Sequence, residues 1–169
     1  MRAIVEIDDR HVLRALNALE SAASQSDRAL REIGATITEN IRLGFDSGAD
    51  PYGRPWKAVL RKGGRPLRNT GNLANSWTYV VRDGAVSIGS NLQVDYDGRS
   101  HNLATIHQRG MTIKPRKAKA LRFTVNGQTA TARSVTIRAR PMVPDRGWPD
   151  DWRDEVTDII AGYIDGAAR

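Results

Sequence analysis

Apolar residues recur at helical spacing through most of the first fifty positions. The stripe comprises Val12, Leu16 and Leu19 and then, after a polar stretch, Leu30, Ile33, Ile37, Ile41 and Phe45. Steps of three or four residues are typical of one face of an α-helix, and Asp8 and Asp9 are candidate N-caps. Such a helix has about 35 residues and is roughly 50 Å long. We therefore expect it either to break near residues 24–26 or to pack along a large surface.

Both ends of the chain carry further local signals. Residues 3–7 (AIVEI) alternate in the way that favours a short strand. Near the C-terminus, Pro149 precedes Asp150 and Asp151, and this order favours a helix start because carboxylates interact well with the N-terminal dipole. The apolar stripe of this second helix consists of Trp152, Val156, Ile159 and Tyr163. Gly166 is its expected end.

Two glycine turns predict β-hairpins in the middle of the chain. Asp83 and Gly84 separate two alternating runs, TYVV and AVSIG, and Asp-Gly is preferred in a two-residue type I′ turn. Asn126 and Gly127 follow LRFTV, and we expect the chain to return through residues 134–139 (SVTIRA).

The order of elements predicts an α+β fold. An antiparallel sheet built from hairpins is packed with the long N-terminal helix and the C-terminal helix, in a single domain of residues 1–169, a length that suits one domain. We expect a long loop at 46–76, with a short helix that begins near Thr70 or Asn72, and a basic loop at 111–120. Residues 103–110 predict another short helix, ended by Gly110.

Composition excludes several kinds of protein. The sequence has no cysteine, so it forms no disulfide, thiol nucleophile or cysteine-ligated zinc site. The first residues lack the apolar run of a signal peptide, and no stretch approaches the roughly 20 apolar residues of a membrane span. We expect a soluble protein, made in the cytoplasm, with no membrane partner.

Motifs of catalysis and metal binding are scarce. The three histidines, His11, His101 and His107, form no metal-binding pair on one helix face. Residues 95–98 (DYDG) resemble the start of a calcium loop, but the later acidic ligands are missing. Phosphate-loop and nucleophile-elbow motifs do not occur. We therefore expect that the protein is not an enzyme and that it binds no metal ion and no cofactor.

Charge is distributed unevenly along the chain. Residues 109–144 carry nine cations and no anion, whereas residues 1–50 have a net charge of −3 and residues 145–169 a net charge of −4. A basic segment of this kind can lie near DNA, because Lys and Arg release counterions from phosphates. Alternatively it is a solvated loop, or basic and acidic faces meet between copies of one protein.

The segment DPYGRPWKAV at 50–59 places two large aromatic residues, Tyr52 and Trp56, in a stretch that is too rich in proline and glycine for regular structure. Tryptophan and arginine are enriched in interface hot spots. The two aromatic side chains therefore anchor the loop, either on the chain's own core or on an adjacent subunit.

Four stretches, taken in order, resemble the phage virion morphogenesis family, the tail-completion proteins of Mu-like and P2-like phages. They are DPYGRPWKAV at 50–59, RPLRNTGNLANSW at 65–77, LATIHQRG at 103–110 and IRARPMVP at 137–144. The likeness runs from about residue 5 to the end of the chain. It departs from the family pattern at Leu103, where tyrosine is common, and in RPMVP, which replaces RPFLG.

The resemblance implies a structural protein of the virion neck or tail end, assembled in the bacterial host cytoplasm. It would act in tail completion or head–tail joining, within a ring around the DNA channel that is often sixfold. Its partners would be copies of itself, the connector, the tail terminator and the tail tube, with non-specific proximity to genomic DNA. A DNA-binding or packaging accessory protein without sequence preference is the alternative, and a phage hydrolase or nuclease that uses His107 is a remote one.

Three sets of candidate site residues follow. The expected subunit interface consists of Tyr52, Arg54, Trp56, Arg140, Pro141 and Met142. The expected DNA-facing residues are Lys114, Arg116, Lys117 and Lys119. The structural motif residues are Thr70, Gly71, Leu73, His107, Gln108 and Gly110.

Overall fold

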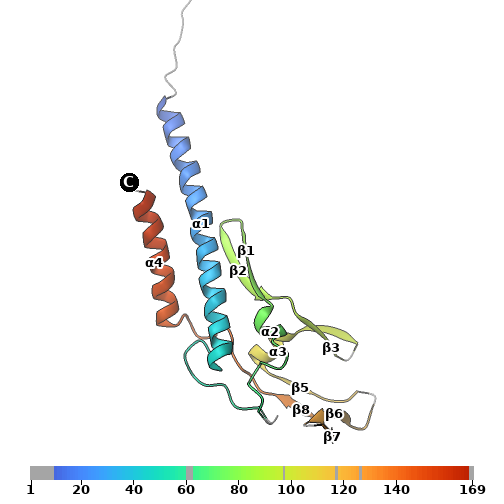
Figure 1. Ribbon diagram of the computed structural model, residues 1–169. Coiled ribbons are helices and arrows are strands. Elements are labelled where there is room, and N and C mark those ends of the chain that lie inside the picture. Colours follow the sequence, from blue (N-terminus) through green and yellow to red (C-terminus); the bar gives the residue numbers. More distant parts are fainter. Residues whose placement is uncertain (1–9, 60–62, 97, 117, 126, 168–169) are drawn as a thin grey trace, which may run out of the picture.

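The stripe of the first fifty residues forms one unbroken helix, α1 (Arg10–Ser47), of 38 residues (Figure 1). The computed structural model describes residues 10–59, 63–96, 98–116, 118–125 and 127–167. The helix does not break near residues 24–26, and at about 1.5 Å per residue it is roughly 57 Å long. The strand expected at residues 3–7 and the N-caps Asp8 and Asp9 lie outside the described residues.

Helix α1 is the axis on which the rest of the chain packs. The C-terminal helix α4 (Asp150–Ala167) lies along one side and the first hairpin along another (Figure 1). The two helices are antiparallel, because Asn40 of α1 donates a hydrogen bond to Glu155 near the start of α4, while Glu32 contacts Tyr163 near its end. As predicted, Asp150 and Asp151 occupy the first turn of α4. The helix runs one residue past Gly166.

The first hairpin has the predicted form. Strands β1 (Trp77–Arg82) and β2 (Ala85–Ser90) pair in antiparallel register, with Tyr79 opposite Ile88. Asp83 and Gly84 have φ angles of 52° and 70°, the left-handed values that a type I′ turn requires at both central residues. The two residues of this turn therefore suit its backbone geometry, as the sequence predicted.

The second hairpin corrects the prediction. Strand β6 (Leu121–Val125) returns through β7 (Gln128–Ala132), with Val125 opposite Gln128, and not through residues 134–139. A two-residue connection forces pairing to resume immediately after Gly127. The residues that were expected to pair here instead form β8 (Val135–Ile137), which pairs with β5 (Met111–Ile113). The segment 111–120 therefore begins as a strand.

The remaining elements are short. A hairpin that we did not predict joins β3 (Gln93–Tyr96) to β4 (Arg99–Asn102), and helices α2 (Asn72–Asn75) and α3 (Leu103–Arg109) lie where short helices were expected. In the part of the chain that the structure describes, the strands form four two-stranded antiparallel sheets. The fold is thus α+β, with antiparallel hairpin strands between an N-terminal and a C-terminal helix.

The hydrophobic core lies where the C-terminal half of α1 meets the loop at 50–59, α2, the first hairpin, α3, the segment before α4 and α4 itself. Ile33, Ile37, Ile41 and Phe45 are at most 7% exposed. They cluster with the buried side chains of Trp56, Leu73, Ala74, Trp77, Ala104, Met142 and Trp152. Leu73, Ala74 and Trp77 come from the segment at 65–77 and Trp56 from the loop at 50–59. Ala104 belongs to α3, Met142 to the segment before α4, and Trp152 to α4. The core therefore joins segments that are far apart in sequence.

Candidate functional site

Three of the four motif stretches meet beside the C-terminal end of α1. We call the place where residues 50–57, 107–110 and 139–147 meet the junction. Ten hydrogen bonds described below connect these segments, and each uses a backbone atom of one partner or both. The fourth stretch, 65–77, reaches the same region through Leu73 in the core and lines a groove together with His107 and Arg140.

Trp56 anchors residues 50–59, which we call the aromatic loop, on the core of its own chain. Its side chain is 8% exposed and its ring meets that of Phe45 edge-on, with centroids 5.6 Å apart. The indole Nε1 donates a 3.0 Å hydrogen bond to the carbonyl oxygen of Pro141, and Met142, the next residue, is 2% exposed. Trp56 and Met142 thus pack within their own chain. A role for these residues between subunits stays a prediction.

Tyr52 anchors the other end of the same loop. Its phenol oxygen accepts hydrogen bonds from the backbone amides of Asp145 and Arg146, at 3.0 and 2.9 Å. The hydroxyl donates to the carbonyl oxygen of Gly147 at 2.9 Å. One side chain thereby holds the turn that leads into α4.

Asp50 organises the loop from within, a role that we did not predict. Its carboxylate accepts hydrogen bonds from the amides of Tyr52 and Arg54, at 3.0 and 2.9 Å, and from Nε of Arg54 at 3.0 Å. This is an Asx-type turn, in which an aspartate side chain binds the backbone two residues ahead. The sequence signal was present, since Asp-Pro-x-Gly is a composition typical of such turns.

Arg140 ties the aromatic loop to helix α3. Its guanidinium donates to the carbonyl oxygen of Lys57 through Nε and Nη2, at 3.3 and 3.0 Å. Its backbone amide donates to the carbonyl oxygen of His107 at 2.7 Å. The structure therefore brings together Arg140, Pro141 and Met142 with the loop that contains Trp56, through contacts within one chain.

Gln108 holds the segment before α4 by its backbone. The side-chain oxygen accepts from the amides of Met142 and Val143, at 2.7 and 3.2 Å. The side-chain nitrogen donates to the carbonyl oxygen of Val143 at 2.9 Å. A primary amide is the side chain that offers both a donor and an acceptor for this purpose, which explains a glutamine at this position.

His107 lies beside these contacts but takes no part in them through its ring. Its Nδ1 atom is buried and has no hydrogen-bond partner among the described residues. Burial lowers the pKa of His107, and the nearby charge of Arg140 lowers it further. The imidazole is therefore held neutral near neutral pH.

The other motif residues shape the backbone. Gly110 ends α3 with φ at 76°, and a side chain there would lie 2.9 Å from the amide nitrogen of Ala139 and the carbonyl oxygen of Ile137. Gly71, with φ at 81°, precedes α2. Thr70 accepts a hydrogen bond from the amide of Asn72 through its hydroxyl. These residues therefore allow close packing and start or stop a helix.

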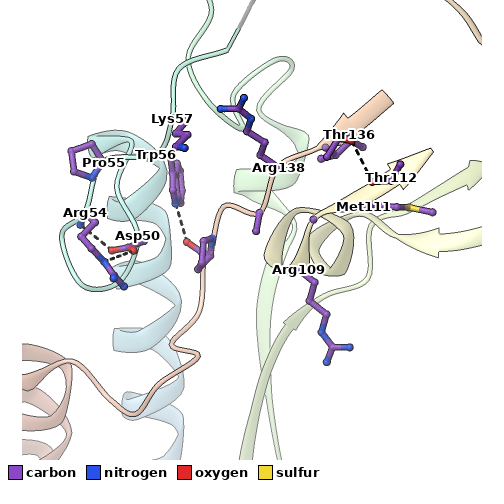
Figure 2. Close-up of a pocket in the computed structure, with 14 residues that line it drawn as sticks. Asp50, Arg54, Pro55, Trp56, Lys57, Arg109, Met111, Thr112, Thr136 and Arg138 are labelled. Carbon is purple, nitrogen blue, oxygen red and sulfur yellow. Dashed lines mark hydrogen bonds and ion pairs between the residues drawn. The ribbon is translucent and has the colours of Figure 1, made fainter. Parts of the chain in front are cut away.

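An open groove of about 630 Å³ lies next to the junction, between the aromatic loop and the β5–β8 pair (Figure 2). Four cations line it, Arg54, Lys57, Arg109 and Arg138, and we call it the basic groove. Asp50 is the acidic residue in its lining, and its carboxylate is already occupied by Arg54 and two amides. Figure 2 shows Lys57 and Arg138 on the same side of the groove, whereas Arg109 points to the other.

The residues expected to face DNA lie elsewhere. Lys114, Arg116 and Lys119 are exposed, and Lys117 lies outside the described residues. The carbonyl oxygen of Lys114 accepts a 2.8 Å hydrogen bond from the hydroxyl of Tyr96, so this segment is held against the β3–β4 hairpin. Lys114, Arg116 and Lys119 do not line the basic groove.

The described part of the chain holds no group of three or more His, Cys, Asp or Glu side chains placed to bind a metal ion. Among the same residues, no helix combines the length and the apolar character needed to cross a membrane. Four polar side chains of the junction, those of Tyr52, Trp56, Gln108 and Arg140, are directed at backbone atoms of another segment. The arrangement is suited to fixing loops in place.

A model of the phage virion morphogenesis family matches residues 7–165, nearly the whole chain. No curated protein and no solved structure matches the chain significantly. The family match confirms the resemblance inferred from the four motif stretches, all of which lie within the matched range.

Proposed function

Since the chain belongs to the phage virion morphogenesis family, we propose that it is a structural protein of the virion neck or tail end. It acts in tail completion or head–tail joining, as one subunit of a ring around the DNA channel. Its partners are further copies of itself and the neighbouring connector, tail terminator or tail tube, and it resides in the virion after assembly in the host cytoplasm.

The observation that carries this proposal is that the motif residues hold distant segments of the backbone in place. Trp56, Arg140 and Gln108 each bind backbone atoms of a segment at least 34 residues away. Buried polar groups that are satisfied in this way give a segment one defined conformation. A ring subunit needs such fixed surface loops, because each loop must present the same shape to every neighbour.

We propose in addition that the protein is not an enzyme. His107, the strongest candidate for a catalytic base, has a buried Nδ1 atom with no hydrogen-bond partner among the described residues, so its ring lacks at Nδ1 the orienting group that a catalytic base commonly has. His107→Gln in the phage should therefore leave infectivity within about threefold of wild type, provided that the variant folds. A loss of infectivity by a folded variant, at normal particle yield, would argue for chemistry at this position.

The test of the structural role is a deletion of the gene in the phage, complemented from a plasmid. Electron microscopy of the lysates should show filled heads and separate or abnormal tails, and the plasmid copy should restore joined particles. Negative-stain images of the purified protein should show rings. Normal infectious virions from the deletion strain would overturn the proposal.

The exposed cations Lys114, Arg116 and Lys119 support a second candidate, a DNA-binding or packaging accessory protein. Binding of this kind depends strongly on salt and little on sequence. Filter binding of duplex DNA at 50 and 200 mM salt distinguishes the two functions. Tight binding by the free monomer at the higher salt favours the accessory protein, whereas weak binding that disappears favours a ring that only encloses DNA.

A further inference from the structure

Helix α4 carries a row of exposed carboxylates along one side. Asp151, Asp154, Asp158 and Asp165 are all exposed, and their spacing places them on one side of a helix of 3.6 residues per turn. Trp152, which is 5% exposed, lies on the opposite side and packs into the core. We call these four aspartates the acidic stripe.

The acidic stripe has no partner in its own chain. Among the described residues, none of its four carboxylates forms a hydrogen bond or an ion pair, although the neighbouring Asp150 binds Arg153 and Glu155 binds Asn40. Four like charges along one helix repel one another. A cationic surface of suitable shape would relieve this repulsion.

The basic groove is such a surface. Lys57, Arg109 and Arg138 line it without a carboxylate partner among the described residues, and its acidic residue, Asp50, is saturated. The positive charge is felt nearby: burial lowers the pKa of Arg140, and the charge of Arg138 lowers it further. Met111, Ile137 and Thr136 form part of the lining, so the groove offers both apolar and polar contacts.

The two surfaces cannot meet within one chain. Helix α4 is fixed to α1 by its opposite face, and no residue of α4 lines the groove. Figure 1 shows α4 on the far side of α1 from β5 and β8. Any contact between them is therefore a contact between different patches of two copies, the heterologous kind that generates rings or filaments.

We propose that the basic groove of one subunit receives the acidic stripe of α4 from a second copy of the chain. The contact rests on the proposed ring and names the surfaces that would close it. We favour a second copy over DNA as the occupant because the chain itself carries the complementary surface: four carboxylates on one helix, unpaired among the described residues, against the cations Lys57, Arg109 and Arg138 in the groove. Charge complementarity of this kind fixes register between subunits.

Cysteine cross-linking tests the contact directly, because the natural chain contains no cysteine. Chains with Arg138→Cys or Lys57→Cys are mixed with chains that carry Asp154→Cys or Asp158→Cys, and a short bismaleimide is added. At least one mixed pair should give covalent dimers at tens of micromolar protein. A chain with both substitutions should give a ladder of oligomers, whereas either single variant alone should give far fewer dimers.

Asp95→Cys supplies the matched control, since Asp95 is an exposed aspartate on β3 outside both surfaces. Its mixtures with Arg138→Cys should cross-link at least about tenfold less. Equal cross-linking of the control would overturn the proposal. So would the absence of cross-links from every mixed pair, in the purified protein and in isolated virions alike.

Charge reversal separates the contact from its alternatives. Arg138→Glu and Asp154→Arg should each weaken self-association about tenfold or more by sedimentation, because each places like charges together. Mixing the two variants should restore part of the association. If Arg138→Glu instead abolishes DNA binding and leaves self-association unchanged, the groove binds phosphates and the proposal fails. Cross-linking that persists although a deletion phage assembles normally would keep the contact and reject the virion function.

Discussion

The indole Nε1 of Trp56 lies 3.0 Å from the carbonyl oxygen of Pro141, across 85 residues of sequence. The same ring meets Phe45 edge-on at 5.6 Å. One side chain thus joins the end of α1, the aromatic loop and the segment before α4. This explains how a stretch rich in proline and glycine is ordered within a single subunit.

Substitution of Trp56 should be costly in two separable steps. Trp56→Phe keeps most of the apolar surface but loses the hydrogen bond to Pro141, and should lower the free energy of unfolding by about 1–2 kcal/mol. Trp56→Ala leaves a cavity beside Phe45 and should lower it by about 3–5 kcal/mol. Urea denaturation followed by circular dichroism measures both values.

The same variants address the interface. If Trp56→Ala unfolds at the wild-type urea concentration but no longer forms rings, the tryptophan acts mainly between subunits. A loss of stability in the monomer would place its principal contribution within the chain, as its 8% exposure indicates.

Asp50 and Arg54 form an ion pair whose two members should differ in importance. The Asp50 side chain is 8% exposed and holds two backbone amides, whereas Arg54 is 53% exposed. Asp50→Ala should lower the free energy of unfolding by about 1–3 kcal/mol, because two backbone amides lose a charged acceptor. Arg54→Ala should cost less than about 1 kcal/mol, as exposed ion pairs do. Equal losses for both variants would show that the ion pair, and not the turn, holds the loop.

Local patterns predicted the parts of the fold that local physics determines. The apolar stripe identified α1, Asp83–Gly84 identified the first hairpin, and Pro149 with two aspartates identified the start of α4. Each signal lies within a few residues of the structure that it specifies. The β5–β8 pair escaped prediction because its strands have three residues each and are more than twenty residues apart, too short for a periodic pattern to identify the partner.

The motifs singled out several residues of the junction, but not the contacts that these residues make. Trp56, Arg140 and Gln108 were recognised from the motifs, yet each binds a carbonyl or amide group that every residue possesses. A backbone acceptor such as the oxygen of Lys57 does not depend on residue type, so the sequence does not indicate that it is a partner. Only the folded chain shows which segment each motif residue holds.

His107 should make stability depend on pH. Its pKa in the folded chain lies below the ordinary histidine value of 6.5, because of burial and then Arg140. The unfolded chain therefore binds more protons between the two values, and stability rises with pH in that range. The full contribution is present above about pH 6.5 and is lost as the pH falls toward the lowered pKa.

His107→Gln removes this titration. The difference in unfolding free energy between the variant and the wild type should change between pH 7.5 and pH 5.5, with the wild type losing more stability as the pH falls. His101→Gln, in the β3–β4 hairpin, serves as the matched control. Parallel pH profiles for wild type and His107→Gln would show that the imidazole does not titrate differently on folding.

Gly34 should tolerate no side chain, because the first hairpin packs directly on it. A Cβ atom at this position of α1 would lie 2.4 Å from Cδ2 of Tyr79, well inside van der Waals contact. Alanine normally stabilises a helix by about 1 kcal/mol relative to glycine. Here the ring or the hairpin must shift, so Gly34→Ala should instead lower the free energy of unfolding by about 1–3 kcal/mol.

Gly162 of α4 is the matched control, since a Cβ atom there meets nothing within 4 Å. Gly162→Ala should therefore raise the free energy of unfolding by about 0.5–1 kcal/mol through helix propensity alone. Tyr79→Leu should reduce the cost of Gly34→Ala, because the shorter side chain can move away from the helix. Urea denaturation measures the change in the free energy of unfolding for each variant. A decrease for Gly34→Ala and an increase for Gly162→Ala would locate the close contact at the hairpin. A stabilised Gly34→Ala variant would show that the hairpin is free to move off α1.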